Sequence, residues 1–287
     1  MGTMVLGGIQ RLRAGSLSAT VPPDVRRSVM FQHLTPEALF TLKGRVVFMT
    51  GGAGGIASGL ARGFAAAGAR LVLVDQNDAV EARAEELRRA GAEVTAEIFD
   101  VTDDAAVRRA IGQAKERTGR LDVVVNNAAV IVRKHVLELS LEEWKRVIDI
   151  DVTACFSVAQ HAARVMVEQG FGRIINLGSI MGHVSRPNLA PYVTAKNAIH
   201  GLTRAMAADL GGTGVTVNAL APGYTATEFS QASQKEFHDF VRDWTPARRW
   251  GTPEDLCGAA LLLASDAGAY INGQVIYVDG GFLAVTR

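Results

Sequence analysis

The chain has 287 residues, 48% of them hydrophobic, and a formal net charge of +1 at pH 7. A chain of this length can bury one large core, its near-neutral charge argues against nucleic-acid partners, and no apolar stretch approaches the ~20 residues that a membrane span needs. Its two cysteines, Cys155 and Cys257, form neither a Cys-x-x-Cys pair nor a cluster with zinc spacing, which favours a reducing, cytoplasmic setting without a bound metal.

The first 30 residues differ in composition from the rest. They contain four arginines against a single acid, Asp24. A basic, acid-poor segment of this kind is typical of a targeting peptide or of a disordered extension. Translation that begins at Met30 is a further alternative. We therefore expect 1–30 to be a disordered extension and 31–287 to be a single domain.

From Lys43 onward, short apolar runs alternate with longer amphipathic ones. The expected strands are 46–50, 70–75, 93–99, 121–126, 172–177, 214–219 and 274–278. The expected helices are 56–67, 79–90, 140–169, 191–210 and 253–265. Strands that are apolar nearly throughout are typical of a sheet covered on both faces, and strand–helix alternation implies right-handed crossovers. The pattern predicts an α/β fold, doubly wound, with a seven-stranded parallel sheet and helices on both faces.

The segment 224–250 breaks this alternation. It follows Pro222-Gly223 and is polar but rich in aromatic residues: Tyr224, Phe229, Phe237, Phe240, Trp244 and Trp250. Because it is too long for a connecting loop, we expect it to form short helices that act as a lid over the ligand site.

A glycine-rich turn directly follows the first expected strand. Residues 50–57 read TGGAGGIA and lead into an expected helix. Backbone N–H groups in such a turn, together with the positive end of the helix dipole, bind the pyrophosphate of a dinucleotide. The same motif without its strand–helix context would be an ordinary turn. The candidate cofactor-binding residues of this turn are Gly51, Ala53, Gly54, Gly55 and Ile56.

The residue that ends the second expected strand, Asp75, bears on the choice of cofactor. Its carboxylate, 24 residues after Gly51, can accept hydrogen bonds from both adenine-ribose hydroxyls and would repel a 2′-phosphate. No Lys or Arg stands in the glycine turn or just after Asp75 to neutralise such a phosphate. NAD is therefore favoured, with NADP left open, and a helix N-cap is the alternative interpretation of Asp75.

Further cofactor candidates follow the third and fourth expected strands. These are Asp100, Val101, Asn127, Ala128 and Ala129. Ligands of open α/β sheets bind at the carboxyl ends of the strands, so these residues should lie beside the glycine turn.

Tyr192 and Lys196 are four residues apart in an expected helix, so the phenol and the ammonium share one face. A free phenol has a pKa near 10, and lowering it to neutrality takes about 3 units, or about 4 kcal/mol. A neighbouring ammonium stabilises the phenolate. The pair predicts a catalytic base that removes the proton of an alcohol during oxidation by a nicotinamide cofactor.

Together these motifs resemble the short-chain dehydrogenase/reductase family over about residues 43–283. The segments that carry the resemblance are the glycine turn, Asp100-Val101, Asn126-Asn127-Ala128, Ser179, Tyr192-x-x-x-Lys196, Pro222-Gly223-x-x-x-Thr227 and Asp279-Gly280-Gly281. Ser179 and Tyr192 lie thirteen residues apart, as in the family. Within the family, the segments 147–151, 245–251 and 277–284 are similar to the gluconate 5-dehydrogenase branch.

The resemblance implies a Rossmann-type fold and a role for each motif. Ser179 would bind the substrate oxygen and Tyr192 would be the base. Lys196 would also bind the nicotinamide ribose, which makes Tyr192 and Lys196 cofactor-binding as well as catalytic. The nicotinamide carboxamide would be oriented by Pro222, Gly223, Thr225 and Thr227.

The sequence departs from the family pattern at three positions. Ala57 replaces the last glycine of the turn, and Ala129 replaces the glycine of the Asn-Asn-Ala-Gly motif. Asp151 stands where the family usually has a catalytic asparagine. We expect Asp151 to be catalytic, continuing a proton relay through water from Lys196.

Local positive charge surrounds the expected substrate site. Arg133, Lys134 and His135 follow the fourth strand, and His183 and Arg186 lie between Ser179 and Tyr192. Such cations suit a carboxylate, and solvated loop charges are the alternative. The predicted substrate contacts are Arg133, Ser179, His183 and Tyr192.

The sequence therefore predicts an NAD(P)-dependent oxidoreductase that interconverts a secondary alcohol and a ketone on a small molecule, favoured as a sugar acid such as gluconate. A polyol or another secondary alcohol is the first alternative, and a non-catalytic NAD(H)-binding redox sensor is the second. Family members usually assemble as tetramers through the helices equivalent to 140–169 and 191–210, so the resemblance implies a homotetramer.

Overall fold

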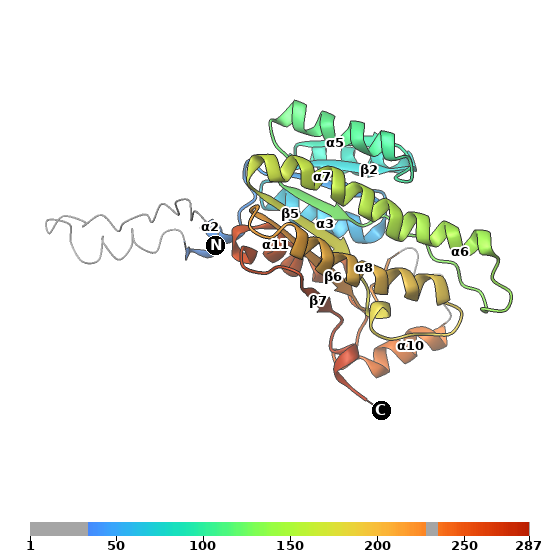
Figure 1. Ribbon diagram of the computed structural model, residues 1–287. Helices are drawn as coiled ribbons and strands as arrows, with labels where there is room; N and C mark the ends of the chain where they lie inside the picture. The colour runs from blue at the N-terminus through green and yellow to red at the C-terminus, as the bar shows by residue number, and fades with distance from the viewer. Residues whose placement is uncertain (1–33, 228–234, 287) are drawn as a thin grey trace, which may run out of the picture. The chain divides into compact units, whose positions relative to one another are not determined.

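A seven-stranded parallel sheet forms the centre of the protein (Figure 1). The computed structural model describes residues 34–227 and 235–286. The strands are β1 (Val46–Thr50), β2 (Arg70–Asp75), β3 (Val94–Ile98), β4 (Val123–Asn126), β5 (Gly172–Leu177), β6 (Val215–Pro222) and β7 (Val275–Val278), in the order β3-β2-β1-β4-β5-β6-β7. The strand order reverses between β1 and β4, and ligands of open sheets bind at such a switch point.

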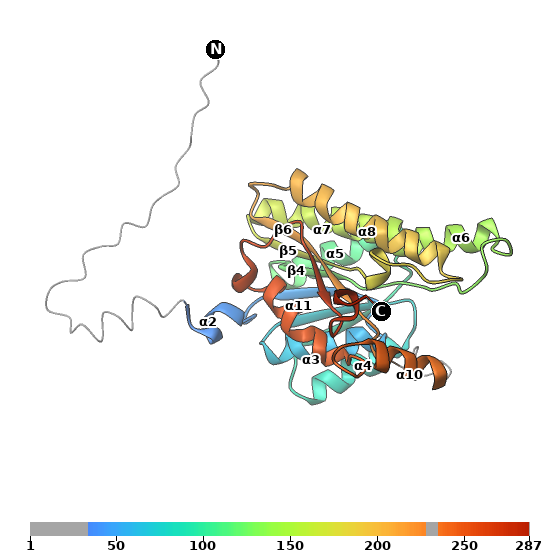
Figure 2. The ribbon, with the colours of Figure 1, turned by 90° about the horizontal axis from the view of Figure 1, so that it is seen from below.

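Helices cover both faces of the sheet, as the sequence predicts. One layer contains α3 (Gly55–Ala66), α4 (Ala79–Arg89) and α11 (Cys257–Ala264), and the other contains α5 (Asp104–Thr118), α7 (Cys155–Gln169) and α8 (Ala190–Asp209). Figure 2 shows the two layers on opposite sides of the strands. Each layer buries its own apolar core, because strands such as β1 are buried on both faces.

Further helices lie outside these layers. They are α2 (Pro36–Phe40), α6 (Leu141–Ile148) and α10 (Lys235–Trp244). The described residues from Phe40 onward belong to one compact unit, and residues 34–39 lie outside it. The expectation for residues 1–30 lies outside the described residues. Among the residues described, no helix is both long and apolar enough to cross a membrane.

The helical stretches show two differences from the sequence analysis. No helix was expected between 99 and 121, yet α5 occupies 104–118. Its start is capped by Asp103, whose side chain accepts the N–H of Ala106, and its end by Gly119 at φ +78°. The expected helix 140–169 contains a π-helical turn, Asp149–Ala154, between α6 and α7. A π turn inserts a residue into the helix and re-aims the side chains within it.

The buried carboxylate of Asp122 ties the amino ends of β1 and β4 together. It accepts the backbone N–H of Val46 at 2.8 Å and two N–H bonds from Arg120 at 2.6 and 2.7 Å. Arg45 lies 3.5 Å away. The Asp122 side chain is fully buried, so its loss would leave several donors without their charged acceptor.

Replacing Asp122 with alanine should lower the free energy of unfolding by about 3 kcal/mol, measured by urea denaturation. Asp266→Ala is the matched control, because Asp266 pairs with the same Arg45 but is exposed. We expect that control to change stability by less than about 0.5 kcal/mol. Equal losses in the two variants would contradict a special role for Asp122.

Candidate active site

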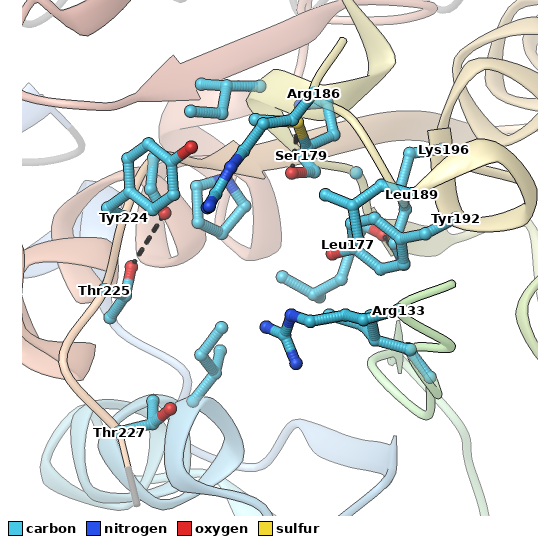
Figure 3. Close-up of a pocket in the computed structure, with 18 of the residues that line it drawn as sticks. Arg133, Leu177, Ser179, Arg186, Leu189, Tyr192, Lys196, Tyr224, Thr225 and Thr227 are labelled. Atoms are coloured by element: carbon cyan, nitrogen blue, oxygen red, sulfur yellow. Dashed lines mark hydrogen bonds between the residues drawn. The ribbon is translucent and has the colours of Figure 1, made fainter. Parts of the chain in front are cut away.

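A cavity of about 520 Å³ opens at the carboxyl ends of β4, β5 and β6 (Figure 3). Asn127 and Ala129 line it after β4, Ser179 lines it after β5, and Pro222 and Gly223 line it at the end of β6. Because parallel strands end at the same edge, residues far apart in the sequence meet here.

The first turns of α8 bring Tyr192 and Lys196 into this cavity. The Lys196 Nζ lies 5.3 Å from the centre of the Tyr192 ring and donates a hydrogen bond to the carbonyl of Leu177 at 3.1 Å. Lys196 is only 3% exposed. The ammonium is therefore held beside the phenol by the end of β5.

The π turn directs Asp151 toward the same lysine. Its Oδ2 lies 3.4 Å from the Lys196 Nζ, and its Oδ1 accepts the N–H of Val130 at 2.8 Å. Asp151 is 2% exposed. The structure thus places a buried ion pair directly behind the predicted catalytic base.

Burial and charge act in opposite directions on this pair. Burial raises the pKa of the Asp151 carboxyl, and the attraction of Lys196 and the N–H of Val130 offset this only in part. Burial lowers the pKa of the Lys196 ammonium, but attraction to Tyr192 in its ionised form and to the Asp151 carboxylate outweighs it and raises that pKa overall. Lys196 therefore stays protonated through the neutral range and can stabilise a phenolate.

Ser179 lies just after β5, with its Oγ accepting the N–H of Met181 at 3.1 Å. The oxygen is thus oriented by the backbone of the following turn, and its proton can donate to a substrate oxygen. The residue is buried and lines the same cavity as Tyr192. Serine and tyrosine can therefore hold one oxygen of a substrate between them.

The glycine turn after β1 is tied to the segment after β4. Gly51 has φ +65°, and a Cβ there would lie 2.9 Å from the backbone of Ala128. The Asn127 side chain donates to the carbonyls of Thr50 and Gly51 at 3.1 and 3.0 Å. Only glycine permits this approach, which leaves the backbone bare where a pyrophosphate would bind.

A second, smaller cavity of about 80 Å³ lies beside this turn. It is lined by Gly51, Asp75, Gln76, Asp100, Val101, Ala128, Ala129, Val130 and Ile150. The Asp75 carboxylate accepts the N–H of Ala53 at 3.1 Å and that of Asn77 at 3.0 Å. Asp75 is not a helix N-cap, because that position of α4 is Asp78. Carboxylates in this place suit the hydroxyls of an adenine ribose.

The predicted residues divide between the two cavities. The larger is lined by Ile56, Asn127, Ala129, Arg133, Ser179, Tyr192, Lys196, Pro222, Gly223, Thr225 and Thr227. The smaller is lined by Gly51, Asp75, Asp100, Val101, Ala128 and again Ala129. Ala53, Gly54 and Gly55 line neither, although they belong to the turn between the two cavities.

His183 lies apart from the other predicted substrate residues. It is not among the described residues that line the larger cavity. Its ring instead meets the edge of the Tyr277 ring, with 6.0 Å between centroids. The loop after Ser179 turns this side chain toward β7, which the sequence pattern did not indicate.

Aromatic residues of the 224–250 segment complete the lining. Tyr224, Phe237 and Trp250 line the cavity, with Tyr224 5.3 Å from the Phe237 ring and 5.6 Å from the Trp250 ring. The aromatic content of this segment, its length and the preceding Pro222-Gly223 were the sequence signs of its position. Gln76, Ile150 and Asn188 also line the cavities and had no distinguishing sequence signal.

No group of three or more His, Cys, Asp or Glu residues is arranged to hold a metal ion within 34–227 and 235–286. The arrangement instead combines a dinucleotide cradle with a phenol and a buried ammonium at one edge of a Rossmann-type sheet. An oxidoreductase that uses NAD(P) is the class of protein that such a site defines.

Comparison with known proteins gives the family. The family model described as enoyl-(acyl carrier protein) reductase matches residues 51–283, and the chain belongs to the short-chain dehydrogenase/reductase family. This confirms the resemblance seen in the sequence, including its gluconate 5-dehydrogenase branch.

Three similar proteins illustrate the match. Gluconate 5-dehydrogenase of Gluconobacter oxydans (strain 621H) is 39% identical over 85% of this chain and 96% of its own length. Galactitol 2-dehydrogenase (L-tagatose-forming) of Cereibacter sphaeroides is 41% identical over 86% and 98%. The crystal structure of a gluconate 5-dehydrogenase from Burkholderia cenocepacia J2315, in complex with NADP and tartrate, is 38% identical with a TM-score of 0.84 and covers 88% of this chain and 100% of its own.

Proposed function

We propose that this protein reversibly oxidises a secondary hydroxyl of a sugar acid such as gluconate, with NAD as the acceptor. The charge of the substrate cavity carries this proposal. Besides Lys196, which is paired with Asp151, its described lining contains Arg133 and Arg186 but no Asp or Glu, although the whole chain has a net charge of only +1. A cationic cavity in a nearly neutral protein favours an anionic substrate. The names of two relatives, gluconate 5-dehydrogenases, support the same class.

In the proposed mechanism, Ser179 and Tyr192 hold the reacting oxygen. Tyr192 removes the hydroxyl proton in the oxidative direction and returns it in the reductive direction. Bound NAD(P) supplies the hydride acceptor or donor. Arg133, which lines the same cavity, would bind the carboxylate of the substrate.

Lys196 lowers the cost of forming the Tyr192 phenolate through its charge, and it would also bind the nicotinamide ribose. Asp151 keeps this lysine charged and in place, as the 3.4 Å contact supports. The proton taken up by Tyr192 would leave toward solvent along a path that begins at Lys196 and continues by way of Asp151.

The preference for NAD over NADP rests on the smaller cavity. Its described lining contains two carboxylates, Asp75 and Asp100, and no Lys or Arg. A 2′-phosphate placed there would meet only negative charge. The Burkholderia relative was solved with NADP. The proposed preference of this chain for NAD can therefore be tested directly by comparing the two cofactors.

Asp75→Ser should shift the ratio of kcat/KM for NADP to that for NAD upward by about 10- to 100-fold, because it removes the repulsion and one ribose acceptor. Initial rates with both cofactors measure the ratio. Asp78→Ser is the control, since Asp78 is exposed and lies outside the cavity lining. If wild type already prefers NADP, the assignment of Asp75 is wrong.

The substrate class is tested by the absorbance of reduced nicotinamide after mixing the protein with NAD and D-gluconate, other aldonates or neutral polyols. Turnover of aldonates well above that of polyols of equal length supports the proposal. A clear preference for a neutral polyol would overturn the sugar-acid assignment but keep the mechanism. The galactitol dehydrogenase among the relatives makes a polyol the specific second candidate.

The described parts of the aromatic segment, 224–227 and 235–250, would act as a lid, since Tyr224, Phe237 and Trp250 line the cavity; the remainder, with Phe229, lies outside the described residues. We further propose a homotetramer. In support, α7 carries the apolar side chains of Phe156 and Val167, which are 43% and 40% exposed in the single chain. Light scattering that shows a monomer would refute the tetramer.

Two free cysteines, Cys155 and Cys257, agree with a reducing, cytoplasmic setting.

A further inference from the structure

The loop between Ser179 and α8 carries Arg186 over the cavity. In Figure 3 its guanidinium extends from the loop toward Tyr224, across the cavity from Tyr192. Arg133 enters from the segment after β4. The two guanidinium groups therefore reach one space from separate parts of the chain.

An aromatic ring holds the Arg186 guanidinium in place. Its Cζ lies 3.9 Å from the centre of the Phe237 ring, on α10, in a cation–π contact. Tyr224 lines the same cavity, and Figure 3 shows the guanidinium directed toward its ring. A long, otherwise exposed side chain is thus pre-oriented before any substrate binds, which reduces the entropy lost on binding.

Tyr224 can itself donate a hydrogen bond to an anion. Burial raises the pKa of its phenol, and the charges of Arg186 and Arg133 offset that only in part. The hydroxyl therefore remains protonated at neutral pH. A protonated phenol has its own proton to donate, so the Arg186 guanidinium and the Tyr224 hydroxyl, which line one cavity, can both donate to the same anion.

We infer that Arg186 and Tyr224 form a subsite that binds the carboxylate of the substrate and determines its selectivity for acids over neutral polyols, with Phe237 positioning Arg186. This inference rests on the proposed function. It adds Arg186, which contacts Phe237 of the aromatic segment, to Arg133 as a second cation for the carboxylate. A planar guanidinium suits a carboxylate because both can form two parallel hydrogen bonds.

The test compares D-gluconate with D-glucitol, which has the same hydroxyls but a CH₂OH group in place of the carboxylate. Binding is measured by calorimetry on the NAD complex of Tyr192→Phe, so that no turnover interferes. Adding Arg186→Met should weaken gluconate binding by about 10- to 100-fold and leave glucitol binding within about twofold. Arg186→Lys should recover only part of the loss, because it keeps the charge but not the fork.

Two further variants separate the subsite from general effects. Phe237→Leu should raise KM for gluconate more than it lowers kcat, without changing binding of glucitol. Arg89→Met removes an exposed arginine of α4 that pairs with Glu85, and it should leave both ligands unaffected. Unchanged NADH affinity in every variant shows that the fold is retained.

The possible outcomes distinguish the inference from the proposed function. Equal losses for gluconate and glucitol in Arg186→Met would overturn the subsite even if gluconate is a good substrate. Gluconate binding that depends on Arg186 but gives no turnover in wild type would uphold the subsite and refute the proposed function. If neither gluconate nor tartrate, the anion bound by the Burkholderia relative, binds more tightly than glucitol, the inference fails.

Discussion

Replacing Tyr192 with phenylalanine should lower kcat for the alcohol substrate by about 10³-fold while NAD(H) binding stays within about threefold of wild type. The change removes only the hydroxyl that we propose takes the substrate proton. The ring that packs beside Lys196, and the contact of Lys196 with Leu177, should remain. Stopped-flow turnover and fluorescence titration with NADH measure the two properties separately.

Tyr270→Phe is the matched control, because Tyr270 is fully exposed. It should leave kcat unchanged. Turnover that survives in Tyr192→Phe would show that another group is the base. Tight NADH binding by wild type, with no turnover of any aldonate or polyol, would favour the redox-sensor alternative.

Replacing Lys196 with methionine should abolish turnover and also lower the free energy of unfolding by about 3–5 kcal/mol near neutral pH. The methionine leaves the Asp151 carboxylate buried without its counter-ion. Equilibrium unfolding in urea measures this loss. Lys115→Met, which breaks the exposed pair with Glu168, should cost less than about 1 kcal/mol.

The cost in Lys196→Met should depend on pH in a defined direction. Without the ammonium, burial holds the Asp151 pKa above its value of about 3.9 in the unfolded chain. The destabilisation is then absent below that unfolded pKa, grows as the pH rises, and is complete above the folded pKa.

Adding Asp151→Asn to Lys196→Met should restore most of the lost stability but none of the turnover, because the buried charge is removed and the lysine is not returned. A loss in Lys196→Met that is independent of pH and unaffected by Asp151→Asn would contradict a buried ion pair.

Much of the fold followed from local patterns. The seven strands were predicted because each is a short, nearly continuous apolar run, and β1 and β2 match their expected bounds. The helix α5 was not predicted, because its sequence is rich in charged residues and its buried face consists mostly of alanine, which gives only a weak apolar periodicity. Asp103 before it and Gly119 after it were the cap signals that could have revealed it.

The candidate cofactor residues could be proposed from the sequence for a similar reason. The glycine turn and Asp75 act through backbone conformation and strand position, which are encoded close in sequence. Tyr192 and Lys196 needed only helical spacing. Asp151 was identified from its position in a family motif, but nothing in the sequence showed that a π turn would bring it within 3.4 Å of Lys196.

Residue type, apolar periodicity and turn chemistry therefore determined the sheet, the dinucleotide cradle and the phenol–ammonium pair of this protein, because each depends on neighbours within a few residues. Only tertiary packing decided that Arg186 meets Tyr224 and Phe237 over the cavity while His183, three residues earlier, turns to Tyr277. The direction of a loop side chain depends on contacts with segments distant in sequence, and no local sequence pattern predicts which of those contacts form.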